Sequence, residues 1–265
     1  MAWKITQLQK TLPKLNNPVL IEGLPGIGNV GKITVDFIKE ETKAKPLYDL
    51  FSNSFPHSVF VNDNNIVELP TIEIYYTKFN NKNKRDLILL SGDVQPIDEE
   101  SSYDFCAEVL KICEKLKCKE IVTLGGIGLQ AAPDVPKIYC TSNGKEIAKR
   151  YIKGTKISNE LYGVVGPIVG VTGLLVGLSK KKNIEAISLL AETFAHPMFL
   201  GIRGAKEILK SIKKTLNINL NMNKLEKEIE KLEKDKVKKI EDLSNVSKEN
   251  AINKLNRKVS TDYIG

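Results

Sequence analysis

Glycines followed by a lysine form the stretch of this sequence that is closest to a known ligand-binding motif. In "VLIEGLPGIGNVGK", residues 19–32, Gly26, Gly28 and Gly31 have the G-x-G-x-x-G spacing of dinucleotide-binding loops. Gly26 to Lys32 also have the G-x-x-x-x-G-K spacing of phosphate-binding loops. In both motifs, backbone N–H groups at the start of a helix bind phosphate oxygens. The spacing therefore raises the hypothesis of a nucleotide site.

Each motif lacks one of its essential parts. A phosphate-binding loop needs Ser or Thr directly after its lysine to coordinate Mg²⁺, but Ile33 follows Lys32 here. A dinucleotide-binding loop needs an acid at the end of the next strand, and Asp49 lies in a segment without a clear strand end. Glycines also allow tight turns and close packing of a helix on a strand, because they lack Cβ. We therefore favour an architectural role for the glycines from Gly23 to Gly31 over phosphate binding.

Two further glycine-rich segments follow strand-like runs. One is "TLGGIGLQ", residues 123–130, which contains Gly125, Gly126 and Gly128, and the other is "GPIVGVTGLLVG", residues 166–177. Loops at the carboxyl ends of parallel strands gather at one edge of a sheet, where ligands usually bind. The three glycine segments together predict either a pocket for an anion or a flat, close-packed interface, and both remain open.

The sequence contains no recognisable catalytic or metal-binding set. His196 follows Glu192 by four residues, but no serine or cysteine is visibly paired with it. Asp93 and Gln95, which follow a strand-like run, are interpreted as turn formers. The four cysteines form no C-x-x-C pair, and neither histidine lies near a cysteine in the sequence. We therefore expect no cofactor and no metal, and we interpret Cys106 and Cys113, which lie seven residues apart in a helical pattern, as core residues of a cytoplasmic protein.

The charge pattern does not favour nucleic-acid binding. The formal net charge is +8, with 42% hydrophobic and 27% charged residues, a composition typical of a soluble globular protein. Most of the net charge lies after residue 205, where basic and acidic residues alternate and aromatic residues are nearly absent. The uncharged run 161–178 contains glycines and a proline, so we expect buried strand, turn and helix rather than a membrane span. We therefore expect neither nucleic acid nor a membrane as a partner.

Apolar strand-like runs alternate with helical patterns through the first 216 residues. The clearest helical pattern is "SYDFCAEVLKICEKL", residues 102–116, where apolar residues recur at intervals of three and four. Such alternation predicts an α/β body of three layers, with a mixed, largely parallel sheet covered by helices on both faces. The strand-like runs are residues 19–22, 58–61, 66–69, 72–76, 87–91, 120–124, 163–165 and 186–190.

The sequence changes in character after residue 216. Residues 217–247 predict an amphipathic or coiled-coil helical extension of the body, which comprises residues 1–216. Residues 248–265 are polar with sparse hydrophobic residues, and they predict a flexible C-terminal tail. The extension has an apolar seam that implies a partner surface, either on the body or on another copy of the chain. This seam is Met222, Leu225, Ile229 and Leu232.

Five blocks of the chain, taken together, are more specific than any single glycine loop. They are "GLPGIGNVGK" (23–32), "LILLSGDVQP" (87–96), "IVTLGGIG" (121–128), "GPIVGVTGLLVGL" (166–178) and "AISLLAET" (186–193). In this order, the blocks resemble the proteasome assembly chaperone family, in particular its archaeal homologues of the Pba type. The resemblance covers most of the chain before the helical extension.

The resemblance implies an α/β body similar to the nucleoside phosphorylase fold, without the phosphorylase catalytic residues. It also implies a non-enzymatic homo-oligomer that binds α-subunits of the proteasome core particle, as an assembly chaperone or an activator-like adaptor. Family members of this type dock a C-terminal tail between α-subunits through an ending of a hydrophobic residue, a tyrosine and any residue. This chain ends "STDYIG", so Tyr263 is similar to that tyrosine but follows Asp262 and precedes both Ile264 and Gly265.

Two other classes of function stay open. The glycine segments and the phosphorylase-like fold also fit an enzyme or a binding protein for a nucleoside or a phosphorylated small molecule, for which Lys32 is the candidate cation. A third possibility is a scaffold whose partner is another protein of the same family. The sequence does not choose among these classes on its own.

Overall fold

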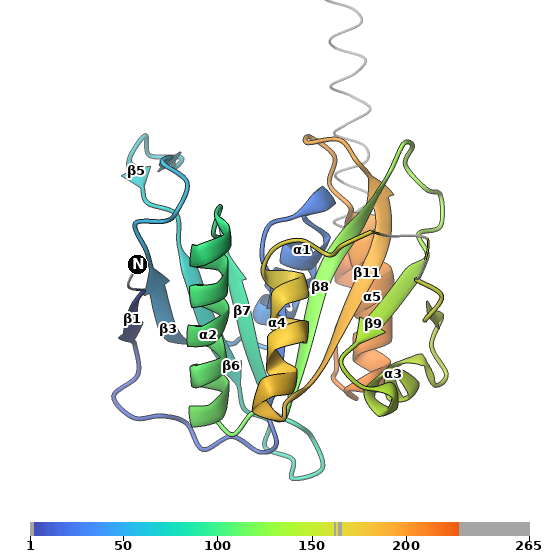
Figure 1. The fold of residues 1–265 in the computed structure, drawn as a ribbon, viewed down its shortest axis with the longest axis horizontal. Coiled ribbons are helices and arrows are strands. Elements are labelled where there is room, and N and C mark those ends of the chain that lie inside the picture. Colours follow the sequence, from blue (N-terminus) through green and yellow to red (C-terminus); the bar gives the residue numbers. More distant parts are fainter. Residues whose placement is uncertain (1–2, 162, 164–165, 228–265) are drawn as a thin grey trace, which may run out of the picture. The chain divides into compact units, whose positions relative to one another are not determined.

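A nine-stranded mixed sheet forms the centre of the α/β body (Figure 1). The computed structural model describes residues 3–161, 163 and 166–227. The chain divides into two compact units, residues 1–220 and residues 221–265, and the sheet belongs to the first unit. In spatial order, the strands are β1 (Lys4–Gln7), β3 (Lys45–Phe51), β6 (Ile72–Thr77), β7 (Leu87–Gly92), β2 (Val19–Gly23), β8 (Glu120–Leu129), β11 (Glu185–Phe194), β9 (Ile138–Ser142) and β10 (Ile157–Ser158).

The parallel part of the sheet lies at its centre. Strands β7, β2, β8 and β11 run parallel to one another. Antiparallel pairs flank them on both sides, between β6 and β7 and between β9 and β11. A separate hairpin of β4 (Phe60–Val61) and β5 (Val67–Glu68) follows β3. The prediction of an α/β body with a mixed sheet is therefore confirmed.

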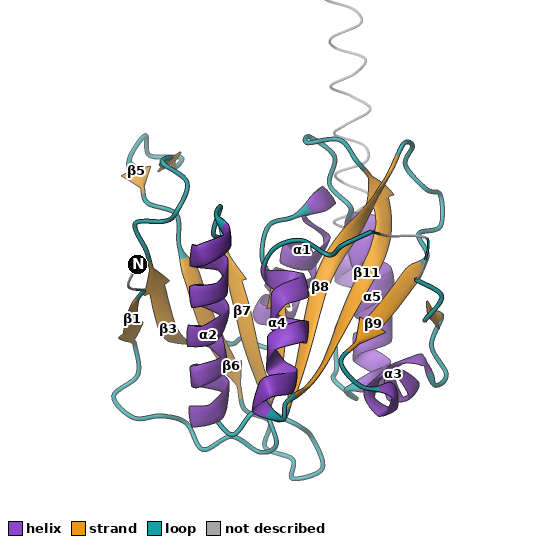
Figure 2. Ribbon diagram, in the orientation of Figure 1, coloured by secondary structure: helices purple, strands orange, loops and turns teal. Residues whose placement is uncertain are grey.

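Helices cover both faces of the sheet (Figure 2). Helices α2 (Glu99–Lys115) and α4 (Val171–Ser179) lie side by side on one face. Helices α1 (Val30–Glu41) and α5 (Ile202–Thr215) lie together on the opposite face, where α3 (Lys145–Ile152) packs against α5. Short 3₁₀ turns precede α1 and follow α4: η1 (Ile27–Asn29) and η2 (Lys180–Lys182). The sheet and its two helical layers form the three layers that the sequence predicts.

The central strands are buried on both faces, which explains their continuous apolar sequences. All five residues of β2, "VLIEG", are buried, and so are all six residues of β7, "LILLSG". Strands of a parallel sheet that is covered by helices have no face in contact with water. Polar residues within them are therefore exceptional, and Glu22 of β2 is one of them.

Helix α2 follows its sequence pattern closely. It begins after Asp98, whose carboxylate accepts a hydrogen bond from the backbone N–H of Ser101 at 2.8 Å and so caps the helix. All four cysteines of the chain are buried and free. The interpretation of Cys106 and Cys113 as core residues is therefore confirmed. The apolar stripe of α2 is buried, and it consists of Cys106, Val109, Leu110 and Cys113.

Several elements differ from the sequence prediction. The glycine segment after Leu124 is not a loop, because β11 pairs with β8 without interruption as far as Leu129. Strand β3 is not evident in the sequence, since Pro46 and a register shift between Pro46 and Tyr48 interrupt its pattern. Strands β1, β9 and β10 are likewise absent from the sequence prediction. Of the strand predicted at residues 163–165, only Gly163 is described, and it lies in a turn.

The uncharged run 161–178 does not form one long helix. Residues 166–170 form a loop that leads into α4, and α4 contains most of the rest of the run. No helix among the residues that the structure describes is both long and apolar enough to cross a membrane. The run contributes a loop and a helix to the body.

The structure describes only the start of the second unit. Residues 222–227 are helical, and they include Met222 and Leu225 of the predicted seam. Ile229 and Leu232 lie outside the described residues, as does the predicted tail with Tyr263, Ile264 and Gly265. The seam and the tail therefore stay predictions.

Candidate functional site: a glycine-lined groove at the strand ends

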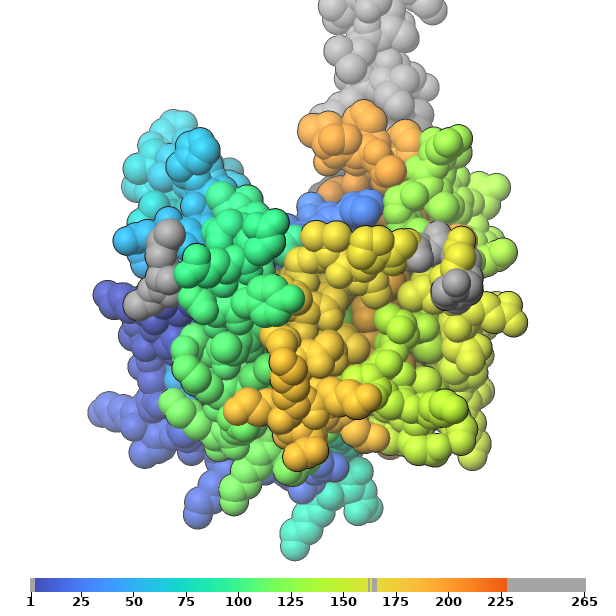
Figure 3. Space-filling model, viewed as in Figure 1, coloured from blue at the N-terminus to red at the C-terminus, as the bar shows by residue number. Residues whose placement is uncertain are grey.

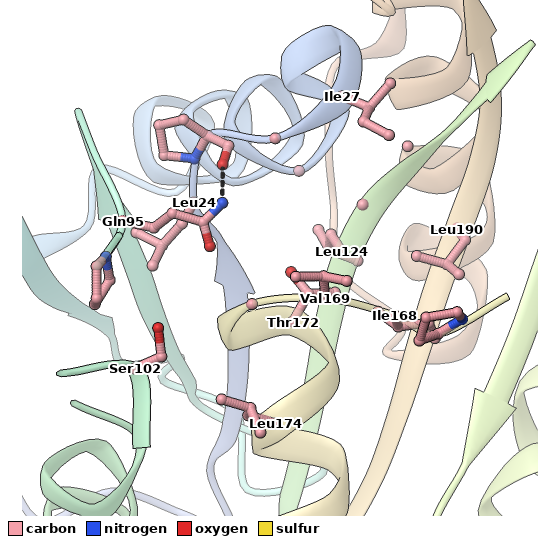
Figure 4. Close-up of a pocket in the computed structure, with 18 of the residues that line it drawn as sticks. Leu24, Ile27, Gln95, Ser102, Leu124, Ile168, Val169, Thr172, Leu174 and Leu190 are labelled. Carbon is pink, nitrogen blue, oxygen red and sulfur yellow. Dashed lines mark hydrogen bonds between the residues drawn. The ribbon is translucent and has the colours of Figure 1, made fainter. Parts of the chain in front are cut away.

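A groove of about 900 Å³ lies at the carboxyl ends of the central parallel strands. Figure 3 shows a hollow there, between the green start of α2 and the blue glycine loop. Five segments line the groove: the loop after β2 with the start of α1, the loop after β7 with the start of α2, the end of β8, β11 at Leu190, and the loop that leads into α4 with the start of that helix (Figure 4). Ligands of open α/β sheets bind at such an edge, where the strand order reverses. The groove is therefore the candidate functional site.

Glycines in the first loop let three backbone segments approach one another closely. A Cβ atom on Gly23 would lie 2.2 Å from the carbonyl oxygen of Gly31, and one on Gly31 would lie 2.6 Å from that of Leu124. A Cβ atom on Gly126 would lie 2.2 Å from the carbonyl oxygen of Ile27. Real side chains do not fit at such distances, so α1 can begin directly against β2 and β8 only because these residues are glycines.

Gly28 and Gly26 differ from these close-packed glycines. Gly28 has φ +62°, in the left-handed region that favours glycine, and a Cβ atom there would lie 2.7 Å from Oγ1 of Thr193. Gly26 has extended backbone with φ −162°, and a Cβ atom there would meet nothing within 4 Å. Neither backbone conformation nor packing therefore explains the glycine at position 26, which lines the groove.

Acidic residues hold Lys32 outside the groove. Its Nζ lies 3.0 Å from a carboxylate oxygen of Asp36 and 3.7 Å from one of Asp93. Lys32 is not among the residues that line the groove. Asp49, the candidate ribose anchor, lies within β3 rather than at a strand end beside the glycine loop. The two residues that a nucleotide site would need at the groove are therefore elsewhere.

The charge of the groove is negative. Its described lining includes Asp98 and Glu99 but no Lys, Arg or His. Hydrogen bonds from the backbone and side chain of Ser101 lower the pKa of Asp98 below its ordinary value, so this carboxyl is ionised at neutral pH. Fixed negative charge repels phosphate groups. The groove is therefore poorly suited to a phosphorylated ligand.

The three predicted glycine segments meet at this groove, although one of them is a strand. Gly23 and Lys32 lie outside the lining, and Gly28 lines a smaller cavity of about 260 Å³ with His196 and its neighbours. The remaining glycines contribute backbone rather than side-chain chemistry to the groove. The glycines of the three segments that line the groove are Gly26, Gly31, Gly125, Gly126, Gly128, Gly166 and Gly170.

A buried carboxyl lies next to the groove and escaped the sequence prediction. Glu22 at the end of β2 is fully buried, and burial raises its pKa to about 7. Its carboxyl accepts hydrogen bonds from the backbone N–H of Leu24 at 3.0 Å and from Oγ1 of Thr172 at 3.3 Å, which oppose part of this rise. Leu24 and Thr172 both line the groove. The feature of the sequence that could have identified Glu22 is its position as a single acid in the otherwise apolar run "VLIEG".

Gln95 joins two of the loops that form the groove. Its side-chain Nε2 donates a hydrogen bond to the carbonyl oxygen of Pro25 at 2.7 Å (Figure 4). A Cβ atom on Gly170 would lie 2.8 Å from the side-chain oxygen of Gln95, so the loop before α4 also approaches this amide closely. Gln95 therefore connects two of the segments and lies close to a third, a larger role than that of a turn former.

The possible pair of Glu192 and His196 does not form a catalytic arrangement. The carboxylate of Glu192 accepts hydrogen bonds from the backbone N–H of Lys137 at 2.9 Å and from the hydroxyl of Tyr139 at 3.2 Å. His196 is exposed and stacks on Phe194, with ring centroids 5.5 Å apart. Within the described ranges, no group of three or more His, Cys, Asp or Glu residues could hold a metal ion.

Comparison with known proteins gives a consistent assignment. A sequence model of the PAC2 family matches residues 20–240 of the chain. The uncharacterised protein MJ1210 of Methanocaldococcus jannaschii is 32% identical over 240 residues, which cover 90% of either protein. A second uncharacterised protein of this organism, MJ0106, is 28% identical over 85% of this chain and 87% of its own length.

Solved structures of archaeal proteins share the fold. PbaB of Pyrococcus furiosus, described as an archaeal proteasome activator, is 30% identical, with a TM-score of 0.80 over 90% of this chain and 98% of its own. PbaA of the same organism, described as an archaeal homologue of a proteasome-assembly chaperone, is 22% identical, with a TM-score of 0.73 over 98% of this chain and 99% of its own. The family match and the identity to these archaeal relatives together show that the chain belongs to the PAC2 family.

Proposed function

We propose that this protein is a non-enzymatic chaperone or activator-like adaptor that binds α-subunits of the proteasome core particle. The observation that carries the proposal is the similarity to PbaB, an archaeal proteasome activator, at 30% identity over nearly the whole of both chains. A shared fold alone does not transfer function. Identity at this level over matched lengths supports a related binding role more strongly than the fold does.

The tail residues Tyr263, Ile264 and Gly265 are the proposed contact with the proteasome. Tyr263 offers an aromatic anchor, one of the side-chain types that contribute most to binding at protein interfaces, and Ile264 adds apolar surface beside it. If several copies of the chain assemble, their tails bind together and the apparent affinity rises through the high effective concentration of the linked tails. Tail docking and self-association are therefore coupled parts of one proposal.

The proposed assembly is a homo-oligomer in which the seam of Met222, Leu225, Ile229 and Leu232 takes part. Apolar residues at alternating intervals of three and four along a helix are typical of surfaces that pack against another helix or body. Light scattering of the full chain should give a mass several times that of the 29.5 kDa monomer. A monomer that persists at all concentrations would contradict this part of the proposal.

Native mass spectrometry with purified archaeal α-subunits tests the binding role. The full chain should form a complex, and a chain that ends at Ser260 should form it much less. Tyr263→Ala should reproduce the loss, whereas the matched control Ser260→Ala should bind like the unaltered chain. Equal binding by the full and the shortened chain would place recognition on the body, and no complex with either form would reject the proposal.

A further inference from the structure

Strand β2 leaves the sheet before its neighbour β8 ends. β2 pairs with β8 from Val19 opposite Glu120 to Glu22 opposite Thr123. On its other side, β8 stays paired with β11 as far as Leu129, which lies opposite Phe194. The last residues of β8 therefore have a strand on one side only. On the other side, the groove lies where β2 would continue if it stayed in the sheet, and this position is called the track below.

The backbone groups that face this track can be assigned from the alternation of the strand. The carbonyl oxygen of Leu129 accepts a hydrogen bond from the backbone N–H of Ala195, directly after β11, at 2.9 Å, so the main-chain groups of Leu129 face β11. Successive residues of a strand point their N–H and C=O groups to opposite sides. The N–H and C=O groups of Gly126 and Gly128 therefore point toward the groove.

These groups form an open strand edge. Neither the strand pairings nor the other backbone hydrogen bonds of the described residues give Gly126 or Gly128 a partner on this side. Gly126 is partly exposed and Gly128 is exposed, so both can be reached from the solvent. Unpaired N–H and C=O groups along a strand are a template for the addition of another extended segment.

The walls of the groove suit the side chains of such a segment. Three apolar residues around it are strongly exposed: Ile27 at 50%, Ile97 at 68% and Val169 at 83%. They come from three different segments around the groove: η1, the loop after β7 and the loop that leads into α4. Apolar residues that surround a groove in this way are typical of an interaction site.

The charge at one end of the groove restricts the partner further. Asp98 and Glu99 are exposed at the start of α2, and the described lining has no cation to balance them. Complementary charge fixes the register and the direction of a bound peptide. A segment with a lysine or an arginine near this end would therefore be favoured over an acidic one.

We propose that the groove binds an extended segment of a partner protein as an additional strand on the Gly126–Gly128 edge of β8. The segment has apolar side chains that contact Ile27, Ile97 and Val169, and a lysine or an arginine beside Asp98 and Glu99. Main-chain hydrogen bonds provide affinity in this mode of recognition, and alternate side chains provide specificity. This inference goes beyond the proposed function, because it requires neither the tail nor a proteasome subunit.

Backbone NMR of the ¹⁵N-labelled full chain tests the proposal directly. The probes are positional-scanning pools of blocked octapeptides, each of which fixes one residue at one position. Pools that fix an apolar residue or a lysine should bind, with the largest amide shifts at Gly126 and Gly128. No binding by any pool at millimolar concentration, or shifts confined to another surface, would overturn the proposal.

Chemical and genetic variants distinguish strand addition from binding by side chains alone. N-methylation of the backbone nitrogens on one edge of the selected peptide should abolish binding, and methylation of the other edge should not. Glu99→Lys should lower the affinity for a lysine-containing peptide by about tenfold. The matched control Glu146→Lys, on the exposed face of α3, should leave this affinity unchanged. Tolerance of methylation on both edges would reject strand addition even if the peptide binds.

Discussion

The side-chain amide of Gln95 donates a hydrogen bond to the carbonyl oxygen of Pro25 at 2.7 Å, and so connects the loop after β7 to the loop after β2. On its other side, the amide leaves no room for a Cβ atom on Gly170, which has φ +83°. Three loops that come from distant parts of the sequence thus meet at Gln95. The shape of the groove depends on this contact.

Gly170→Ala should destabilise the fold by about 1–3 kcal/mol, because the new methyl group meets Gln95 and the backbone is left-handed at this position. Gln95→Ala should relieve part of this cost in the double variant. Urea unfolding of the two single variants and the double variant measures the coupling. The matched control is Gly177→Ala, in an exposed position of α4 with nothing within 4 Å, which should stabilise the protein by about 0.5–1 kcal/mol. If the stability changes of Gly170→Ala and Gln95→Ala were additive in the double variant, this would contradict a contact between the two residues.

Gly126→Ala should be more damaging than Gly26→Ala, although both glycines line the groove. The first substitution places a Cβ atom 2.2 Å from the backbone oxygen of Ile27, and backbone can move little. We expect a loss of about 2 kcal/mol or more. Gly26→Ala adds a methyl group in open space and should change stability by less than about 0.5 kcal/mol. Thermal unfolding of the two variants compares their stability losses. Equal losses would contradict the close packing of η1 on β8.

Glu22 should make the protein less stable as the pH rises. Burial raises its pKa from 4.5 to about 7 in the folded state, so the folded chain binds the proton more tightly than the unfolded chain. The contribution to stability is complete below pH 4.5 and is lost as the pH rises through 7, by roughly 3 kcal/mol. Glu22→Gln should flatten this part of the profile, measured by urea unfolding from pH 4 to pH 8. The exposed Glu99→Gln is the control for loss of one carboxyl, and it should keep the slope of the unaltered protein.

Tyr151→Phe should shift acid unfolding to higher pH. The Tyr151 hydroxyl donates a hydrogen bond to Glu120 at 2.6 Å, and Arg85 and Arg150 lie 2.7 and 2.9 Å from the same carboxylate. Burial acts to raise the pKa of Glu120, but these partners outweigh it and lower the pKa below its ordinary value. Stability from this carboxylate is present above its ordinary pKa and is lost as the pH falls through the folded value.

Removal of the hydroxyl should cost about 1–3 kcal/mol at neutral pH, because the buried carboxylate loses one donor. Circular dichroism across an acid titration measures both the loss and the shift. Tyr103→Phe, in which the ring is half-exposed, is the matched control. It should change the free energy of unfolding by less than about 0.5 kcal/mol and leave the pH of acid unfolding unchanged. An unchanged acid transition in Tyr151→Phe would contradict the role given to this hydrogen bond.

Calorimetry with ATP, NAD and inorganic phosphate should give no saturable heat. The described lining of the groove carries two acids and no cation, and Lys32 is paired with Asp36 and Asp93. Saturable binding that Lys32→Ala abolishes would favour the alternative of a nucleotide-binding protein or enzyme. Lys39→Ala is the matched control, since Lys39 also pairs with Asp36 but lies about two helical turns further from the glycine loop.

The features that could be predicted from the sequence depend on short-range patterns. The buried strand at residues 19–23 and the stripe of α2 are visible because each element is periodic over its own length. The glycines of residues 23–31 are equally visible, and their pattern favours an architectural role. The reason for each glycine was not visible, because the atoms that exclude a Cβ, such as the oxygen of Leu124, come from distant segments.

The features that escaped prediction depend on the tertiary arrangement. Gly125 to Gly128 look like a loop in sequence, and only the pairing with β11 makes them a strand. Glu22 is an acid in an apolar run, but its burial beside Thr172 follows from the position of α4. The outer strands β1, β9 and β10 are short or irregular, and neighbouring strands determine their conformation more than their own sequences do.

The open space around Gly26 gives the protein a natural position for a reporter group. All four native cysteines are buried, so a thiol-reactive fluorophore would be directed to a cysteine introduced by Gly26→Cys. The dye would stand at the rim of the groove without displacing any backbone atom. Its emission would change when a partner enters, so occupancy of the groove could be followed in real time, separately from events at the C-terminal tail.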